Sequence, residues 1–306
     1  MPDISPSLHL PVLLDEVLRA AIGAERAVDA TLGHGGHAEA LRAQGMTLLG
    51  IDRDPDALET ARARLGNERI DYLLSSYDAP VALEAVTALH PDFILLDLGV
   101  SSRQLDDEQR GFTFRPGAPL DMRMGNSGPT AADWLNEVDA DELARVFYEY
   151  GDERRSRVLA REIARRRARS AFTISDDLVN AIRATLGPQS GPGDFARLFQ
   201  ALRIAVNDEL AGLERALPVF RDALSSGGRL AVISYHSGED RLVKHAFREW
   251  GRDCVCPQHQ PICICGARAL GAAQPRKAIV AGVAEVARNP RARSAKLRIF
   301  RVADAA

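Results

Sequence analysis

Cysteine is scarce in this 306-residue sequence, and hydrophobic runs are short. All four cysteines fall between residues 254 and 265, which excludes a disulfide framework for a protein of this size. The longest clean apolar runs, FILL at 93–96 and LAVI at 230–233, have the length of strands, so neither can span a bilayer. The opening residues, MPDISPSLHL, lack the cationic segment and apolar stretch of a secretory signal. We therefore expect a cytoplasmic protein that does not enter a membrane.

Charge of one sign is not in large excess either, because the formal net charge is −3. Taken alone, that total argues against a nucleic-acid partner. The charge is unevenly distributed, however: residues 153–170 and 288–301 are strongly cationic, whereas 106–153 is rich in aspartate and glutamate. Only local basic surfaces matter for contacts with phosphates, so a nucleic-acid partner stays open.

Short apolar segments alternate with helical patterns through the N-terminal third of the chain. Strands are expected at 27–30, 47–52, 70–75 and 92–99, and helices at 12–21, 37–43, 54–65 and 80–89. Asp54 opens the helix at 54–65 as its N-cap, with Pro55 in the first turn. Apolar strands that alternate with helices indicate a parallel sheet covered on both faces, and thus an α/β fold.

This alternation stops after the fourth strand. From about residue 106 to 204 the sequence shows only helical periodicity and loops. A fifth strand is expected at 227–237, and residues 295–302 alternate polar and apolar side chains like an edge strand. The simplest division is a two-part sheet domain and a helical domain inserted after strand four, at 1–107 with 205–306 and at 108–204.

A glycine-rich loop follows the first strand and leads into a helix. Gly33, Gly35 and Gly36 permit a sharp turn and a close approach of a ligand to the backbone, and the helix N-terminus offers free N–H groups. Residues 33–38 fit the pattern G-x-G-x-x-A of dinucleotide sites, which is a weak signal alone. Asp52 ends the second strand, where its carboxylate suits the ribose hydroxyls of NAD or of S-adenosylmethionine equally well.

Two acidic residues favour S-adenosylmethionine over a dinucleotide. Asp29 ends the first strand ahead of the glycines, where it suits an ammonium or sulfonium group and repels a pyrophosphate. Asp97 ends the fourth strand, at the sheet edge where open α/β sheets bind substrates. The alternative interpretation is that Asp29 and Asp52 merely cap helices.

Several longer blocks make the family recognisable. They include DATLGHGGHAEAL, ILLDLGVSSRQLDDEQRGFTF, APLDMRM, FQALRIAVNDEL, ISYHSGEDRLVK and NPRARSAKLR, in order between about residue 9 and residue 302. Together they resemble the bacterial methyltransferases that modify the exocyclic amino group of a cytidine in small-subunit ribosomal RNA, the MraW or RsmH type. The length and number of the blocks make this resemblance far more specific than the glycine pattern.

The resemblance implies a Rossmann-like class I methyltransferase fold, interrupted by a helical domain, that acts on 16S rRNA within the small ribosomal subunit. It also implies a set of contacts to S-adenosyl-L-methionine, from Gly35, Gly36, His37, Asp52, Tyr77, Asp97 and Gln104. Two positions depart from the family pattern. Tyr77 stands where phenylalanine is usual and can still stack on adenine. Gly238 stands where leucine is usual, which concerns local packing rather than chemistry.

The reaction requires acceptors aimed at the amino hydrogens of cytosine, whose nitrogen lone pair is delocalised into the ring. We expect Asp97 to lie closest to the cofactor and the amino group, with Ser101 or Ser102 assisting. The alternative is that these serines only cap the next segment, a common role of serine. His236 follows strand five, and we expect a structural hydrogen-bonding residue there rather than a base.

Arginines are dense on a helix predicted within 153–170. They are Arg154, Arg155, Arg157, Arg161, Arg165, Arg166, Arg167 and Arg169. We expect them to contact RNA, as Arg291 and Arg293 could do before the last strand. The alternative is a solvated face paired with acidic neighbours.

The four cysteines, Cys254, Cys256, Cys263 and Cys265, form two C-x-C pairs that could surround a zinc ion. The usual spacing in such sites is C-x-x-C, so metal-free thiols or a local redox pair stay open. Many members of the resembled family lack this segment, and catalysis is not expected to depend on it.

Three other functions are weighed against rRNA methylation. Methylation of DNA or of a small molecule is disfavoured by the basic helical insert. A ribosome-assembly factor that binds the cofactor without turnover is disfavoured because Asp97 at the end of the fourth strand and the glycine-rich loop are both present. An NAD-dependent oxidoreductase is disfavoured because no lysine, tyrosine or histidine constellation for hydride transfer stands out. The sequence leaves the oligomeric state open, a homodimer included.

Overall fold

The computed structural model describes residues 11–257, 260 and 262–304, apart from the side chains of Ser102 and Arg103. The chain forms two compact units, one of residues 1–99 with 210–306 and one of residues 100–209. They are called the sheet unit and the helical unit here. No helix in the described part of the chain is long and apolar enough to cross a membrane.

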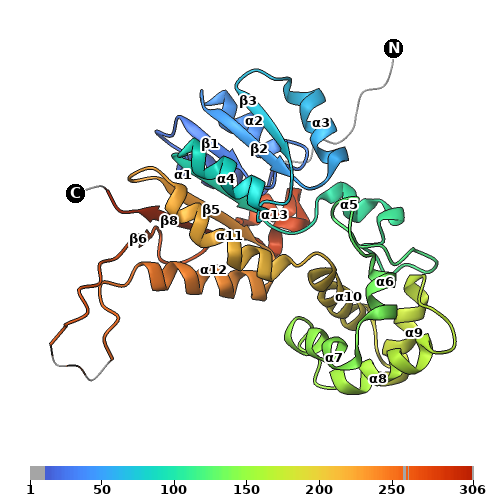
Figure 1. Cartoon of the computed structure of the whole chain (residues 1–306). Helices are drawn as coiled ribbons and strands as arrows, with labels where there is room; N and C mark the ends of the chain where they lie inside the picture. The colour runs from blue at the N-terminus through green and yellow to red at the C-terminus, as the bar shows by residue number, and fades with distance from the viewer. Residues whose placement is uncertain (1–10, 258–259, 261, 305–306) are drawn as a thin grey trace, which may run out of the picture. The chain divides into compact units, whose positions relative to one another are not determined.

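The sheet unit is organised by one eight-stranded sheet within the described residues (Figure 1). Its strands are β1 (Arg26–Asp29), β2 (Thr47–Asp52), β3 (Ile70–Leu74), β4 (Phe93–Asp97), β5 (Arg229–Ser234), β6 (Gly271–Ala273), β7 (Ile279–Val280) and β8 (Lys296–Val302). The order is β3-β2-β1-β4-β5-β8-β6, with β7 also paired to β8. β1 to β5 are mutually parallel and β8 is antiparallel to β5. The predicted Rossmann-like, mostly parallel sheet is confirmed.

Alternate side chains of the central strand β4 enter two separate cores. Phe93 and Leu95 pack in one apolar cluster, whereas Ile94 and Leu96 pack in the other. Successive side chains of a strand point to opposite faces of a sheet, so both faces must be covered by helices. This is why the strand is a continuous apolar run rather than an alternating one.

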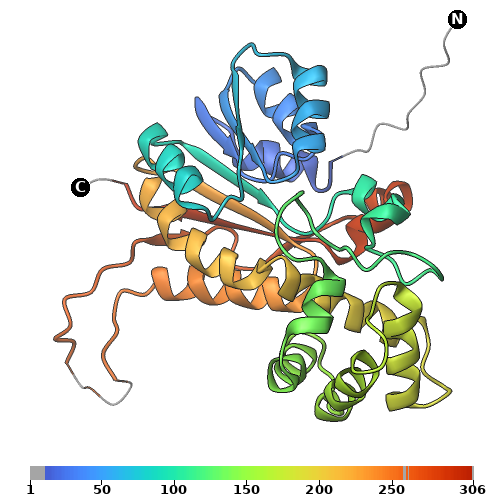
Figure 2. The same cartoon turned by 45° about the vertical axis from the view of Figure 1, so that its right-hand side comes forward.

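The helices of the sheet unit lie on both faces. They are α1 (Leu14–Ala20), α2 (Gly36–Ala43), α3 (Pro55–Leu65), α4 (Pro80–Leu89), α11 (Glu209–Ala223), α12 (Ser237–Trp250) and α13 (Val283–Arg288), with a 3-10 turn η2 (Pro290–Ser294). Helices α1 to α3 contribute to the core on one face, and α4, α11 and α12 to the core on the other. Figures 1 and 2 show α11 and α12 side by side. Asp54 caps α3 as predicted, because its side chain accepts a hydrogen bond from the N–H of Asp56 at 3.1 Å.

The prediction of an edge strand at 295–302 is wrong. β8 pairs with β5 on one side and with both β6 and β7 on the other, so it lies inside the sheet. β6 and β7 span only three and two residues, too few to show any periodicity in the sequence.

The helical unit has a core of its own. Its elements are α5 (Ser102–Asp106), the 3-10 turn η1 (Glu108–Arg110), α6 (Ala131–Glu137), α7 (Ala140–Glu149), α8 (Ser156–Arg167), α9 (Ser175–Leu186) and α10 (Pro192–Val206). Buried side chains such as Phe147, Ile163 and Leu198 form one apolar cluster within it. The helical character expected between about 106 and 204 is therefore present.

The units divide outside the predicted boundaries, because both flanking segments bond to the segment at 122–124. Gln104 donates to the carbonyl oxygen of Met124 at 3.1 Å. Asn207 accepts from the Met124 N–H at 2.8 Å and donates to the Met122 carbonyl oxygen at 2.7 Å. Residues 100–107 and 205–209 thus belong to the helical unit. They do so through long-range contacts that no local sequence pattern predicts.

Candidate functional site

The carboxyl ends of parallel strands meet at one edge of the sheet, called the carboxyl edge here. Asp29, Asp52 and Asp97 end β1, β2 and β4 at this edge. The register aligns Asp29 with Leu95 of β4, two residues before Asp97. Three acidic side chains from segments far apart in the chain are therefore gathered in one place by the topology alone.

The glycine loop forms a tight turn between β1 and α2. Gly33 and Gly35 have φ values of 52° and 78°, a left-handed backbone that glycine adopts without strain. A Cβ atom on Gly35 would lie 2.7 Å from Leu65 Cδ1, so the loop is also pressed against α3. Gly35 is the N-cap of α2 and provides no side-chain cap. The first N–H groups of this helix are thus left for a ligand.

Asp52 ties the glycine loop to the second strand. One of its carboxylate oxygens accepts from the Gly33 N–H at 2.7 Å, and the other accepts from the Asp54 N–H at 2.9 Å. Burial raises the pKa of Asp52, while these N–H groups lower it. Through these two hydrogen bonds, Asp52 stabilises the conformation of the glycine loop.

Asp29 is the most buried carboxylate of this edge, with 1% of its surface exposed. The Thr31 N–H donates to it at 3.3 Å. Burial raises the pKa of Asp29 to about 7, and the nearby charges of Asp97 and Asp52 act in the same direction. Among the described residues, no cationic side chain pairs with Asp29 to stabilise its charge.

Asp97 is held by groups from three other segments. Its backbone N–H donates to Thr31 Oγ1 at 2.6 Å, and the Tyr235 hydroxyl donates to its Oδ1 at 2.8 Å. His37 Nδ1 lies 3.7 Å from its Oδ2. Burial raises the pKa of Asp97, against the lowering effects of His37 and Tyr235. The carboxylate is thus fixed in direction and still 24% exposed.

His37 belongs to the first turn of α2 and is buried. Its Nε2 lies 3.0 Å from the carbonyl oxygen of Val12, which can only accept, so Nε2 carries a proton. The other ring nitrogen, Nδ1, therefore faces Asp97. His37 connects the glycine loop to the acid at the end of β4.

Two residues of this edge were missed by reasoning from the sequence. Thr31 and Tyr235 lie in recognisable blocks, but nothing local shows that their side chains reach Asp97. The carboxylate of Asp97, together with burial, raises the pKa of Tyr235 well above its ordinary value, so the hydroxyl stays a hydrogen-bond donor. A signal was available in the position of Tyr235 directly after β5, which is the neighbour of β4.

His236 has the structural role expected of it. Its Nδ1 accepts from the N–H groups of Gly238 and Glu239 at 3.2 and 3.4 Å, which makes it the N-cap of α12. Glu239 in return accepts from the backbone of Tyr235 and His236. The pair positions the turn that carries Tyr235.

The remaining predicted residues lie in two places. Tyr77 is partly buried in the loop after β3 and packs against a core of the sheet unit. Ser101 and Gln104 belong to the helical unit and cap each other: Ser101 Oγ accepts from the Gln104 N–H at 3.2 Å, and Gln104 Oε1 accepts from the Ser101 N–H at 2.9 Å. This is the capping role weighed as the alternative for the serines. The side chain of Ser102 lies outside the description, and the catalytic roles of both serines stay predictions.

The arginine-rich segment forms α8 with short extensions at both ends. Arg165 and Arg166 pair with Glu162 at 2.6 and 2.7 Å. Arg167 donates to two backbone carbonyl groups. In the described part of the chain, Arg154, Arg155, Arg157, Arg161 and Arg169 form no ion pair, and all five are exposed. The charges of Arg165 and Arg166 are thus partly neutralised by Glu162, whereas the five exposed arginines without an ion pair could contact phosphates.

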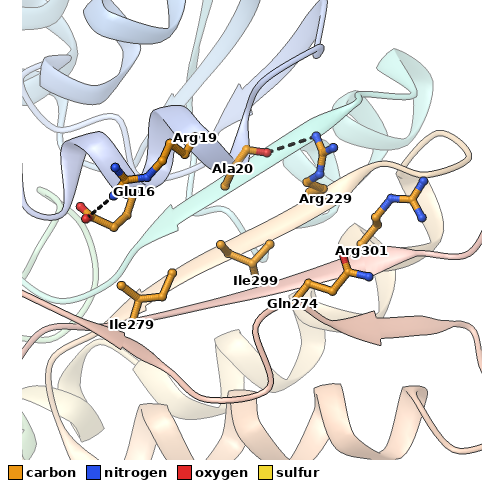
Figure 3. Close-up of a pocket in the computed structure, with 8 residues that line it drawn as sticks. All are labelled: Glu16, Arg19, Ala20, Arg229, Gln274, Ile279, Ile299 and Arg301. Atoms are coloured by element: carbon orange, nitrogen blue, oxygen red, sulfur yellow. Dashed lines mark hydrogen bonds and ion pairs between the residues drawn. The ribbon is translucent and has the colours of Figure 1, made fainter.

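A cavity of about 320 Å³ lies between α1 and strands β5, β7 and β8 (Figure 3). Arg229, which begins β5, and Arg301, near the end of the antiparallel β8, line it. Arg229 donates to the carbonyl oxygens of Ala20 and Ile22, and Arg301 pairs with Asp304. Both arginines are thus engaged, and none of the three aspartates lines the cavity.

Comparison with known proteins places the whole chain in one family. The model of the MraW methylase family matches residues 6–303. The ribosomal RNA small subunit methyltransferase H of Gemmatimonas aurantiaca is 53% identical over 300 residues, which covers 96% of this chain and 95% of that protein. The protein of the same name from Heliobacterium mobile is 45% identical over 305 residues, 95% of this chain and 97% of its own.

Among solved structures, an rRNA methylase from Streptococcus thermophilus aligns over 99% of this chain and 100% of its own. Its sequence identity is 12% and the TM-score is 0.40. The strand order described above, rather than this alignment, therefore identifies the fold.

Proposed function

Since this chain belongs to the MraW methylase family, we propose that it transfers a methyl group from S-adenosyl-L-methionine to the exocyclic amino nitrogen of a cytidine in 16S rRNA. The observation that carries the proposal is the carboxyl edge itself. Three acids whose pKa values are raised chiefly by burial stand beside an uncapped helix N-terminus, and Asp29 has no cationic partner among the described residues.

This edge is complementary to the charges of the methyl donor. The sulfonium and ammonium groups of S-adenosylmethionine are cationic, and they would relieve the desolvation of Asp29 and its neighbours. The donor's carboxylate suits the free N–H groups at the start of α2, which include those of Gly36 and His37. The pyrophosphate of a dinucleotide would instead be repelled by Asp29. The carboxylate of Asp52 would accept hydrogen bonds from the ribose hydroxyls of the donor.

Catalysis in this proposal depends on Asp97 as a fixed acceptor. When bound, the donor supplies a methyl carbon that the amino nitrogen attacks, and the electrons of the breaking C–S bond remain on sulfur. Asp97 accepts a hydrogen bond from the amino group, which orients the nitrogen and stabilises the positive charge that develops on it. Tyr235 and His37 keep the carboxylate in place. The surplus proton leaves the nitrogen after transfer and reaches solvent, so no separate base is required.

The RNA is bound in part by the helical unit. Its unpaired arginines around α8 offer phosphate contacts that do not depend on sequence. The target cytidine must be single-stranded or extruded from its stack to reach Asp97. A cytoplasmic location, where small ribosomal subunits are assembled, is part of the same proposal.

The decisive experiment measures tritiated methyl transfer to small ribosomal subunits from a strain that lacks this protein, followed by nucleoside analysis. We expect label in N4-methylcytidine of the 16S rRNA. Small subunits from the parent strain, which are already methylated, serve as the control and should accept none. Label in another nucleoside would overturn the assigned target. Binding of the donor and of subunits without any transfer would instead favour an assembly factor.

A further inference from the structure

A long arm connects α12 to β6 and carries all four cysteines of the chain. Residues 251–270 form no helix or strand where the structure describes them. Figures 1 and 2 show one described half of the arm leaving the end of α12 and the other leading into β6. Val255, Ile262 and Ile264 in it are 59%, 73% and 77% exposed. The described residues of the arm therefore form no apolar core that could hold its shape.

The cysteine sulfurs nevertheless converge on one point. Cys254 and Cys256 lie on the outgoing half of the arm, and Cys263 and Cys265 lie on the returning half. Their Sγ atoms all lie within 4.8 Å of one another. Cys263 is 3.4 Å from Cys254, 3.6 Å from Cys265 and 4.0 Å from Cys256, and Cys265 is 3.8 Å from Cys254.

These separations are those of a tetrahedral thiolate site. Four sulfurs at about 2.3 Å from a zinc ion are about 3.8 Å apart when the angles are tetrahedral. A disulfide holds its sulfurs at about 2.0 Å, and all four cysteines are free. An iron–sulfur cluster distributes its cysteines over several metal atoms, so sulfurs bound to different metal atoms lie further apart than all four do here.

Backbone hydrogen bonds support the same geometry. The Val255 N–H donates to Cys265 Sγ, and the Cys256 N–H donates to Cys254 Sγ, both at 3.4 Å. Such N–H groups stabilise the negative charge that thiolates carry as metal ligands. The first of these bonds also joins the outgoing half of the arm to the returning half.

We infer that Cys254, Cys256, Cys263 and Cys265 bind one structural zinc ion as thiolates. Four sulfur ligands select zinc among the common divalent ions and leave no open coordination position for substrate or water. The thiols release their protons to solvent as the ion binds. The ion would cross-link the two halves of the arm and so replace the core that the arm lacks.

The site is remote from the carboxyl edge. β6, to which the arm returns, pairs with the end of β8 that lies opposite Arg229, the first residue of β5. Asp97 pairs with Ile233 near the other end of β5. Loss of the ion should therefore unfold the arm and leave methyl transfer to RNA intact. Failure of this inference would also leave the proposed methyl transfer untouched.

The test is the metal content of the full-length protein, purified without chelators and under reducing conditions. We expect one zinc per chain by elemental analysis and by native mass spectrometry. Cys256→Ser and Cys263→Ser, one from each half of the arm, should lose the ion. The matched control is Ile264→Ser, an exposed change between two of the ligands, which should retain one zinc. After exchange of the metal, Co²⁺ should give the strong visible absorption of a tetrahedral thiolate complex.

Protection from protease provides an independent measurement. Trypsin can cleave after Arg252 and Arg268, which flank the four cysteines. A chelator should speed cleavage there at least several-fold in the parent protein and have no effect in Cys263→Ser. Protein that stays metal-free after incubation with Zn²⁺, a mass lower by the hydrogens of two disulfides, an iron chromophore, or zinc retained by both cysteine variants would each overturn the assignment.

Discussion

The carboxyl edge of the sheet and the helix α8 both concentrate charge of one sign, but their surroundings differ. Among the three aspartates of the edge, Asp29 is almost fully withdrawn from solvent, and burial raises its pKa to about 7. The arginines of α8 lie at the surface, and two of them share Glu162, whose pKa they lower to about 2. The carboxylate of Asp29 is buried and has no cationic partner among the described residues, whereas charge in α8 is exposed and partly compensated.

The difference separates two kinds of binding. Uncompensated buried charge costs free energy in the empty protein, and a ligand of opposite charge recovers that cost. Such a site can discriminate a sulfonium from a neutral thioether. Exposed arginines are screened by water and salt, so they attract a polyanion without selecting among its sequences. Variants at the edge should accordingly have larger effects than variants in α8.

The largest effect is expected for Asp97→Asn. An amide keeps the shape and can still accept from Tyr235, but it loses the negative charge that stabilises the developing cation. The methyl-transfer rate at saturating donor and RNA should fall about a hundredfold to a thousandfold. The control is Asp92→Asn, just before the start of the same strand, where Asp92 accepts backbone N–H groups of Glu25 and Arg26. An unchanged single-turnover rate for Asp97→Asn would show that the carboxylate has no catalytic role.

The next effect concerns pH and the charge of the ligand. Because the pKa of Asp29 in the folded protein is about 7, its ionisation costs stability as the pH rises from about 4 to about 7. A cationic ligand favours the ionised form, so the affinity for S-adenosylmethionine should rise by up to about tenfold per pH unit and level off above about pH 7. S-adenosylhomocysteine lacks the sulfonium charge and should show a weaker dependence.

Calorimetric titration of both ligands between pH 5.5 and about 8 measures this difference. Asp29→Asn should remove most of the pH dependence of S-adenosylmethionine binding. Asp71→Asn, which changes an exposed acid on β3, should leave it as in the parent protein. Equal pH slopes for the two ligands in the parent protein would contradict the assignment of a sulfonium-binding role to this edge.

A smaller loss is expected for Tyr235→Phe, which removes one hydrogen bond to Asp97. A hydrogen bond to a charged group contributes about 1.5–3 kcal/mol, so the rate should fall about tenfold to a hundredfold. Because the hydroxyl lowers the pKa of Asp97, its loss should also shift the acidic limb of the rate–pH profile to higher pH. Tyr72→Phe, whose hydroxyl bonds to a backbone carbonyl in a loop, is the control. A lower rate with an unshifted profile would limit Tyr235 to a packing role.

The smallest effect is expected for reversal of charge at Arg154, Arg157 and Arg161, which are exposed; Arg154 precedes α8, and the other two lie one turn apart on it. RNA affinity should fall a few-fold, and the dependence of log K on log salt should become shallower by about 2–3. Reversing the acid-paired Arg145 and Arg165 should change affinity less, because each already pairs with glutamates. Filter binding over a range of salt concentrations measures both quantities. Identical slopes for the parent and the triple variant would exclude these arginines from RNA binding.

The sequence predicted those parts of the fold that are encoded locally. Strands such as β2 and β4 are apolar runs bounded by turn residues, and Asp54 with Pro55 marks the start of α3. The pairing of β8 on both sides was not predictable, since β6 is short and Gly271 and Ala272 carry almost no side chain. The extent of the helical unit was also missed, because it depends on Asn207 bonding to the distant residues Met122 and Met124.

The candidate site divides in the same way. Asp29, Asp52 and Asp97 were found because each ends an apolar run, and the carboxyl ends of parallel strands share an edge. Their partners Thr31 and Tyr235 were not found, since a long-range side-chain hydrogen bond has no local pattern. The roles of Tyr77 and Gln104 rest on the family resemblance, and those of Ser101 and Ser102 rest on the need for acceptors beside Asp97. These roles remain predictions, as do the contacts with the donor from Gly35, Gly36, His37, Asp52 and Asp97.

The separation of β4 from β5 along the chain affects how the protein is made. These strands are neighbours in the sheet, yet about 130 residues lie between them, which takes a ribosome roughly 10 s to synthesise. During that time the backbone of β4 has no partner on one side, and Ile94 and Leu96 lack the α11 and α12 side chains that later cover them. The complete helical unit emerges within the same interval. The nascent chain thus carries a folded insertion and an open, aggregation-prone strand edge at once.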